Sequence, residues 1–187
     1  IKWTASIWDV DSLNFLLQYD IPFIKIPSAL VTHWELLDLI NKAKKPVVIS
    51  NGMTTEEDFD KAMNILKDCE VTIMLCNSSY PAKYNELNLL YLDVLKEKYP
   101  NCKIGFSGHE LGNTATLVAV SMGVDVIERH VTLDHNMKGT DHSSSLEINS
   151  LPELKELINT ICLIRGEPIK KVYDSEVKIA QKLRYYN

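Results

Sequence analysis

Two histidines of this 187-residue chain stand where parallel-sheet enzymes keep their chemistry, at the carboxyl ends of strands. His109 follows the buried-strand pattern Ile104–Phe106, and His130 follows a second such pattern, Val124–Ile127. One right-handed crossover joins the two predicted strands, so their carboxyl ends lie side by side at one rim of a sheet. Two neutral imidazoles at that rim can hold a divalent metal such as Mn or Zn and leave coordination positions open for a substrate.

A lysine and several short polar side chains stand at the ends of the other predicted strands. Lys25 supplies one compact positive charge. Its companions at the strand ends are the hydroxyls and amides of Ser6, Ser28, Ser50, Asn51, Asn77, Ser78, Tyr80 and Ser107. A phosphate or carboxylate group of a small ligand needs this combination of one charge and many donors. The set therefore predicts an anion-binding site beside the two histidines.

Each of these residues also has an ordinary structural explanation. A serine at a strand end is more often a helix cap than a ligand contact, and Lys25 alone could be a surface lysine. A single buried histidine is more often a hydrogen-bonded structural residue than a ligand. Two histidines at adjacent strand ends favour a ligand role over a structural one. We assign no function to His33 or His135, which we expect in a loop or on a helix surface.

Strand patterns alternate with helix patterns along the chain, as in βα units around a parallel sheet. The predicted strands are Lys2–Ile7, Ile21–Ile26, Pro46–Ile49, Val71–Cys76, Ile104–Phe106 and Val124–Ile127. The predicted helices are Val10–Tyr19, Trp34–Lys44, Thr54–Lys67, Leu87–Lys98, one helix between the last two strands, Leu151–Ile164, and a charged terminal helix within Glu167–Asn187. We expect Asp9 or Asp11 to cap the first helix and Thr32 the second. The polar loop Thr132–Ser145 has a length that is usually functional or disordered.

Six successive βα units, each with polar residues just after its strand, predict an α/β fold. The best match is a (β/α)8 TIM barrel of which about six units are present. The glycine fingerprint GxGxxG of dinucleotide-binding sheets does not follow the first strand. No repeat or linker divides residues 1–187, so we expect a single catalytic barrel domain. Eight strands close a barrel, so six leave two sheet edges for other segments to cover.

Composition excludes several classes of function. The net charge of -5 argues against binding nucleic acid over a broad surface. No apolar run approaches the roughly 20 residues that span a bilayer, and the N-terminus lacks a secretory pattern. We therefore expect no membrane partner and a cytoplasmic location. The four cysteines show no CxxC pairing, so we expect reduced, structural thiols, with Cys76 and Cys102 acting as small hydrophobes.

Five segments together resemble the barrel domain of the sialic acid (N-acetylneuraminate) synthase family, and they follow it in order. They are FIKIPSA (Phe23–Ala29), PVVISNGM (Pro46–Met53), MLCNSSYPAKY (Met74–Tyr84), IGFSGHELG (Ile104–Gly112) and VIERHVTLDHNMKGTDHSSSLE (Val126–Glu147). The last two are the most specific, because barrel packing alone does not require ERHVTLD followed by GTDHSSSLE. The resemblance covers essentially the whole chain.

This resemblance implies an enzyme that condenses phosphoenolpyruvate with an N-acetylmannosamine-type sugar and releases phosphate. It assigns His109 and His130 as ligands of a divalent metal, Mn or Mg, and names them with Lys25 as the catalytic residues. It assigns Tyr80 and Asp141 to the sugar. The positions assigned to phosphoenolpyruvate are Ser6, Lys25, Ser28, Ser50, Ser78 and Ser107, with Asn77 able to supply the amide that the family commonly carries at position 78.

The chain departs from the family pattern beside one of the two histidines. The family usually has Ser-Asp-His where Ser107, Gly108 and His109 stand, and threonine where Glu110 stands. The carboxylate of Glu110 could replace in part the one that orients the imidazole. Leu30 stands where many members are acidic. The resemblance also implies two earlier βα units and a C-terminal antifreeze-like domain outside this chain, and a homodimer for the full-length protein.

Two other interpretations remain open. A related metal-dependent aldolase or 3-deoxy-sugar-acid synthase would use the same rim with a different aldehyde. A non-catalytic sugar-phosphate-binding protein would keep the pocket without turnover. The sequence does not specify which amino sugar is used or whether it carries a phosphate.

Overall fold

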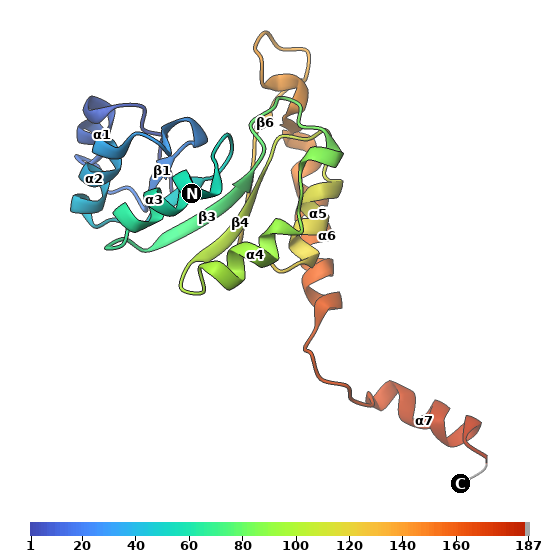
Figure 1. Cartoon of the computed structure of the whole chain (residues 1–187). Coiled ribbons are helices and arrows are strands. Elements are labelled where there is room, and N and C mark those ends of the chain that lie inside the picture. Colours follow the sequence, from blue (N-terminus) through green and yellow to red (C-terminus); the bar gives the residue numbers. More distant parts are fainter. Residues whose placement is uncertain (186–187) are drawn as a thin grey trace.

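A computed structural model describes residues 1–185 of the chain, and its centre is a parallel sheet in the order β1-β2-β3-β4-β5. The strands are β1 (Ile24–Ile26), β2 (Val47–Ser50), β3 (Val71–Cys76), β4 (Lys103–Gly108) and β5 (Val126–Arg129). The sheet curls into an open half-barrel (Figure 1). The predicted α/β fold of incomplete TIM-barrel type is therefore confirmed.

Helices before, between and after these strands cover the outer face of the sheet (Figure 1). They are α1 (Val10–Leu16), α2 (Trp34–Ala43), α3 (Glu56–Ile65), α4 (Tyr91–Lys98), α5 (Thr114–Ser121) and α6 (Leu151–Arg165). Short 3-10 turns occupy Ser28–Leu30, Tyr84–Glu86, His142–Ser144 and Ile148–Ser150. The side chain of Asp9 caps α1 as predicted, but His33, not Thr32, caps α2 through its Nδ1 atom. The helix begins at Trp34, as expected, so its N-cap is the residue directly before it, His33.

The core lies between the sheet and these helices. Side chains of alternate strand residues point to opposite faces, so one set of each strand packs outward against the helices and the other faces the inside of the half-barrel. Ile24, Ile26, Ile49, Ile73 and Phe106 are buried almost completely. Burial of such side chains stabilises the fold by about 1.5–3 kcal/mol each. The same alternation gives each strand end a polar side chain that faces inward.

The first predicted strand, Lys2–Ile7, is reduced to a single parallel bridge between Ser6 and Lys25, so this prediction is wrong in extent. The amide of Ile7 also donates to the carbonyl of Lys25. This segment pairs on one side only within the described residues, and an edge strand with one partner forms fewer ladder bonds. It still brings Ser6 to the rim beside β1.

Two other boundaries differ from the predicted ones. The strand expected at Val124 starts at Val126, because Asp125 pairs with Ile104 through both its amide and its carboxylate. The helix expected from Leu87 starts at Tyr91, since Asn88 adopts a positive φ of 47° that interrupts a helix. Neither shift moves a predicted site residue off its strand end.

The segment after β5 is an ordered excursion, not a simple loop. It contains a short parallel pair, β6 (Val131–Thr132) with β7 (Leu146–Glu147). The chain then enters α6 and ends in α7 (Asp174–Leu183), which stands away from the half-barrel (Figure 1). The predicted terminal helix is thus shorter at its start, and Tyr186 and Asn187 lie outside the described residues. Within residues 1–185, no helix combines the length and apolar character needed to cross a bilayer.

Candidate active site

A cavity of about 540 Å³ opens at the carboxyl ends of the strands. Its lining includes every site residue predicted from the sequence except Asn51, whose Oδ1 accepts from the amide of Cys76, and Asn77: Ser6, Lys25, Ser28, Ser50, Ser78, Tyr80, Ser107, His109, His130 and Asp141. It also includes Trp8, Pro27, Ala29, Met53, Cys76, Glu128 and Arg129. The βα topology brings together side chains that are up to 135 positions apart, from Ser6 to Asp141.

Lys25 is the cation at the floor of this cavity. Its Nζ donates to Ser50 Oγ over 2.7 Å and to its neighbour's carbonyl, that of Ile26, over 3.3 Å. The side chain is 11% exposed, and burial lowers the pKa of Lys25, an effect that the charge of Glu128 opposes. The ammonium is thus held on fixed partners and can attract an anion without first being ordered.

Glu128 is a cavity residue that we did not select from the sequence. Its Oε1 accepts from Ser107 Oγ over 2.8 Å and lies 3.8 Å from Lys25 Nζ. The sequence does contain a signal for Glu128. Side chains two positions apart in a strand share a face, so Glu128 faces the same side as His130. The same rule places Ser107 and His109 together on the neighbouring strand.

Three polar groups gather where β1, β2 and β3 end. The amide of Gly52 donates to Ser28 Oγ over 3.0 Å. A Cβ atom placed on Gly52 would lie 2.2 Å from Ser78 Oγ and 2.8 Å from Ser28 Oγ. Glycine at this position therefore lets the backbone lie directly against the two hydroxyls.

His109 is held in one orientation by groups on both ring nitrogens. Its Nδ1 lies 2.7 Å from the carbonyl of Asn77, which can only accept, so Nδ1 carries the proton. The opposite nitrogen, Nε2, then accepts from the hydroxyl of Tyr80 over 3.0 Å. Burial and nearby negative charge raise the pKa of Tyr80 to about 12, which keeps that hydroxyl protonated. The ring is 5.2 Å from the ring of His130, centroid to centroid.

His130 has weaker anchors than His109. Its Nδ1 lies 3.9 Å from the carboxylate of Asp141, and its side chain is 40% exposed. Burial lowers the pKa of His130, and the neighbouring His109 lowers it further, while Asp141 and Glu128 act against that shift. The neutral imidazole that a metal ligand must be is therefore the favoured form.

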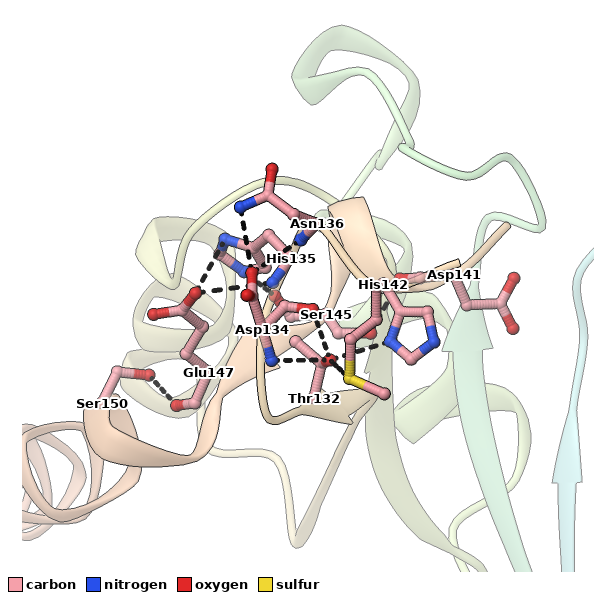
Figure 2. A network of polar contacts seen from close by, with 10 residues as sticks. Thr132, Asp134, His135, Asn136, Asp141, His142, Ser145, Glu147 and Ser150 are labelled. Carbon is pink, nitrogen blue, oxygen red and sulfur yellow. Dashed lines mark hydrogen bonds and ion pairs between the residues drawn. The ribbon is translucent and has the colours of Figure 1, made fainter. Parts of the chain in front are cut away.

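A network of polar contacts within the excursion after β5 places Asp141 at the cavity (Figure 2). Thr132 Oγ1 lies 2.8 Å from Nδ1 of His142, the residue after Asp141. The carbonyl of Asp141 accepts from the hydroxyl of Ser145 over 2.7 Å. His135, to which we assigned no function, contacts the carbonyl of Ser145 over 2.7 Å and so braces the same segment.

Two expectations about side chains of β3 and the following turn are wrong. The carboxamide of Asn77 does not face the cavity: it accepts from the amide of Ser79 and donates to the carbonyl of Glu86. Asn77 serves the site through its carbonyl instead. Cys76 is not a small core hydrophobe, because its Sγ lines the cavity 3.9 Å from both Ser78 Oγ and His109 Nδ1. The four cysteines are free thiols, as expected.

Comparison with known proteins matches residues 1–170 to the model of the NeuB family. The chain belongs to the NeuB family. It is 34% identical to N-acetylneuraminate-9-phosphate synthase from Homo sapiens over 185 residues, which is 98% of this chain and 52% of that protein. It is 36% identical to N,N'-diacetyllegionaminic acid synthase from Campylobacter jejuni over 183 residues, 95% of this chain and 54% of that protein. The chain thus spans about half the length of these relatives.

Solved structures support the same assignment within the NeuB family. The chain aligns with N-acetylneuraminic acid synthetase from Leptospira borgpetersenii, solved with citrate, at a TM-score of 0.85 and 30% identity, covering 95% of this chain and 64% of that one. It aligns with DAHP synthase from Thermotoga maritima at a TM-score of 0.69 and 16% identity, covering 85% and 49%. The second likeness, at that identity, shows a shared fold alone.

The two histidines of this NeuB-family chain fit a divalent cation as a pair. The bond from Nδ1 of His109 to a backbone carbonyl is the kind of outer contact that fixes a metal-ligating imidazole. Nε2 would then be the ligating nitrogen, and a metal there would take the place of its hydrogen bond from Tyr80. Residues 1–185 contain no cluster of three or more histidine, cysteine or carboxylate groups with the spacing to hold a metal. The protein would therefore supply two imidazole nitrogens to a bound cation, and substrate and water would have to supply the other ligands.

Proposed function

We propose that the protein containing this chain is a sialic-acid-type synthase that condenses phosphoenolpyruvate with the open-chain aldehyde of an N-acyl amino sugar and releases phosphate. One observation carries the proposal: Lys25 with its hydroxyls and the His109–His130 pair open into the same cavity. An anion site and a site for an electrophile thus stand side by side. The names of the relatives, synthases of N-acetylneuraminate-9-phosphate and diacetyllegionaminic acid, support this chemistry.

Lys25 and the hydroxyls are suited to the phosphate and carboxylate of phosphoenolpyruvate. Charge-assisted hydrogen bonds from an ammonium are roughly twice as strong as neutral ones. Ser50 already orients the ammonium, while Ser28 and Ser78 lie against the close backbone of Gly52. Ser6 and Ser107 complete the set of hydroxyls on the lining. Holding the donor in this way fixes its C3 atom relative to the histidine pair.

The sugar is assigned to the side of the cavity formed by Tyr80 and Asp141. The phenol of Tyr80 faces both histidine rings, with centroids 4.1 Å from His109 and 5.5 Å from His130. The carboxylate of Asp141, half-exposed at the rim, can accept hydrogen bonds from sugar hydroxyls. Both groups therefore lie next to the place where the aldehyde must be bound.

His109 and His130 are the proposed ligands of a divalent metal, Mn or Mg. When bound there, the metal supplies Lewis-acid polarisation of the aldehyde oxygen. The protein orients the reactants so that C3 of phosphoenolpyruvate forms a bond to the aldehyde carbon, whose oxygen takes a proton and becomes a hydroxyl. Water adds at C2, and the proton it loses balances the one taken by the aldehyde oxygen. The new C2 hydroxyl then loses its proton as the bond from C2 to the phosphate oxygen breaks, and a 2-keto acid and hydrogen phosphate leave. Lys25 stabilises the negative charge on the departing phosphate.

The test is phosphate release by the complete protein with phosphoenolpyruvate, Mn²⁺ and a panel of aldehydes. N-acetylmannosamine, its 6-phosphate and its 2,4-diacetamido-deoxy analogues should support release, and sugars without an N-acyl group should not. Turnover with a simple sugar phosphate alone would indicate a 3-deoxy-sugar-acid synthase or aldolase. Binding of phosphoenolpyruvate without release under any condition would indicate a non-catalytic binding protein. Full activity after removal of all divalent metal would contradict the role given to the histidines.

A further inference from the structure

A buried ion pair lies next to the two cavity histidines in the chain. Glu110 follows His109 in the chain, and Arg129 precedes His130. Arg129 Nη1 lies 2.7 Å from Glu110 Oε1, and the two side chains are 4% and 0% exposed. Each histidine is thus covalently next to one member of the pair, so the pair links the backbone at the end of β4 to the backbone at the end of β5.

Arg129 makes three further bonds to the same region. Its Nη2 donates to the carbonyl of Glu110 over 2.8 Å. Its Nη1 also donates to the carbonyl of Gly112 and to the hydroxyl of Thr116 on α5, both over 2.8 Å. One guanidinium therefore fastens the segment after His109 and the first turn of α5 to the strand that presents His130. Gly108 of β4 and Arg129 of β5 are the last two residues that pair between these strands.

Stability alone is a poor explanation for this pair. Among the described residues, Glu110 Oε2 and Arg129 Nε are buried without a hydrogen-bond partner. Desolvation of two charges offsets much of their attraction, and buried pairs are often no more stabilising than apolar residues of the same size. Burial lowers the pKa of Arg129, in keeping with that desolvation. What the pair does provide is a fixed geometry between two strand ends.

Gly108 leaves the room in which the carboxylate of Glu110 lies. A Cβ atom on Gly108 would lie 2.6 Å from Glu110 Oε2, 2.8 Å from Phe106 Cε1 and 3.1 Å from Arg129 Cδ. Any larger residue at position 108 must displace the Glu110 carboxylate. An aspartate there would begin at this Cβ, between Glu110 Oε2 and Arg129 Cδ, so its carboxylate would compete with that of Glu110 for the same space.

We propose that Glu110 and Arg129 are positioning residues that set the separation of His109 and His130 and thereby the affinity for a divalent cation. This arrangement requires glycine at position 108, because a side chain there would displace the carboxylate of Glu110. The inference rests on the proposed function for the cation. His109 has its own anchors, since its Nδ1 bonds the carbonyl of Asn77 and its carbonyl accepts from the amide of Ala82. The carbonyl of His130 also accepts from a backbone amide, that of Leu146 over 2.8 Å, but the His130 ring has only the more distant Asp141 carboxylate, 3.9 Å from Nδ1. Release of Arg129 should therefore displace the His130 ring more than the His109 ring.

The first test compares Glu110→Gln with the parent in the complete, metal-free protein. Glutamine keeps the shape and one bond to Nη1 but removes the charge. We expect the fold to be retained, because Arg129 keeps its bonds to the carbonyls of Glu110 and Gly112. We expect the Kd for Mn²⁺, measured by calorimetry, to rise at least tenfold. The NMR signals of the His130 ring should shift before any metal is added, and those of His109 should shift less. The matched control is Glu70→Gln, which breaks the exposed pair with Lys103 (2.8 Å) at the other end of β4. This control should change neither the Kd for Mn²⁺ nor the NMR signals of the histidine rings.

The second test moves the carboxylate. Glu110→Ala should weaken Mn²⁺ binding more than Glu110→Gln does. Gly108→Asp alone should also weaken it, because two carboxylates then compete for one space. The double variant Gly108→Asp/Glu110→Ala should bind Mn²⁺ within about threefold of the parent, since the new carboxylate pairs with Arg129. A double variant no better than Glu110→Ala would contradict the inference.

The outcomes separate this inference from the proposed function. A parent that binds no Mn²⁺ refutes the metal role in the proposed function, while the His130 shift in metal-free Glu110→Gln still tests the positioning role. A parent that binds Mn²⁺, with Glu110→Gln binding within twofold and the His130 ring signals unmoved, overturns the positioning role alone. Arg129→Lys provides a second variant, because it keeps the charge and loses the planar fork; it should weaken Mn²⁺ binding at least fivefold, and unchanged binding would again overturn the role.

Discussion

The hydroxyl of Tyr80 lies 3.0 Å from Nε2 of His109, and the two rings lie together with centroids 4.1 Å apart. The nitrogen that faces Tyr80 is the one that would ligate a metal, because Nδ1 is committed to the carbonyl of Asn77. Tyr80 therefore stands between the proposed metal ligand and the region assigned to the sugar. A substitution that keeps the ring and removes the hydroxyl can separate these roles.

For Tyr80→Phe we expect the KM for the amino sugar to rise about tenfold, which corresponds to the loss of one hydrogen bond of about 1.4 kcal/mol. The KM for phosphoenolpyruvate should change less than threefold, since the phenol is not among the groups around Lys25. Steady-state kinetics with each substrate varied in turn measures both. Equal increases in the two KM values would contradict the assignment of Tyr80 to the sugar.

Replacement of Lys25 removes the cation beside Ser50 and Glu128. A hydrogen bond to a charged group contributes roughly 1.5–3 kcal/mol, so Lys25→Met should raise the KM for phosphoenolpyruvate or lower kcat/KM by about 10- to 100-fold. The KM for the sugar should change little. Lys103→Met, at the exposed end of β4, is the control and should leave both unchanged. Loss of sugar affinity equal to the loss of phosphoenolpyruvate affinity would count against this role of Lys25.

The stability contributed by Lys25 should depend on pH in one direction. Burial lowers the pKa of this lysine in the folded state below its value of about 10.4 in the unfolded chain. Between these two pKa values the unfolded state binds more protons, so stability due to Lys25 increases as pH rises through the folded pKa. Urea unfolding of the parent and of Lys25→Met, at pH 7 and at pH 10, measures this effect. The free energy of unfolding of the parent should rise relative to that of Lys25→Met between pH 7 and pH 10. A shift toward the variant would contradict the burial of a charged lysine.

Gly52→Ala should disturb the anion site with little effect on the fold. The new Cβ would lie within 2.8 Å of the hydroxyls of Ser28 and Ser78, and these side chains can rotate away. We expect the KM for phosphoenolpyruvate to rise about tenfold, consistent with one or two neutral hydrogen bonds lost. The thermal unfolding temperature should fall by only a few degrees. Gly112→Ala is a useful contrast: it has open space around it but a φ of +70°, so it should cost stability without a change in that KM.

Much of the site could be predicted because parallel strands place their carboxyl ends at one rim. Lys25, Ser50, His109 and His130 needed only the strand pattern and the side-chain period of two. The same period points to Glu128, which directly follows the predicted strand Val124–Ile127 but was not among the predicted site residues. Asn77 is not part of the lining of this cavity, because a local turn takes its carboxamide and only its carbonyl turns toward His109. Sequence does not show which polar group of a residue faces inward.

The sequence by itself determined the order of βα units and the residue types delivered to each strand end, because hydrophobic period and turn residues are local properties of the chain. The tertiary structure decided which of those groups contact one another. The bond of Lys25 to Ser50, the fixed tautomer of His109 and the ion pair of Glu110 with Arg129 join residues 19 to 32 positions apart. Such contacts depend on the curvature and register of the sheet, which only the packed fold sets.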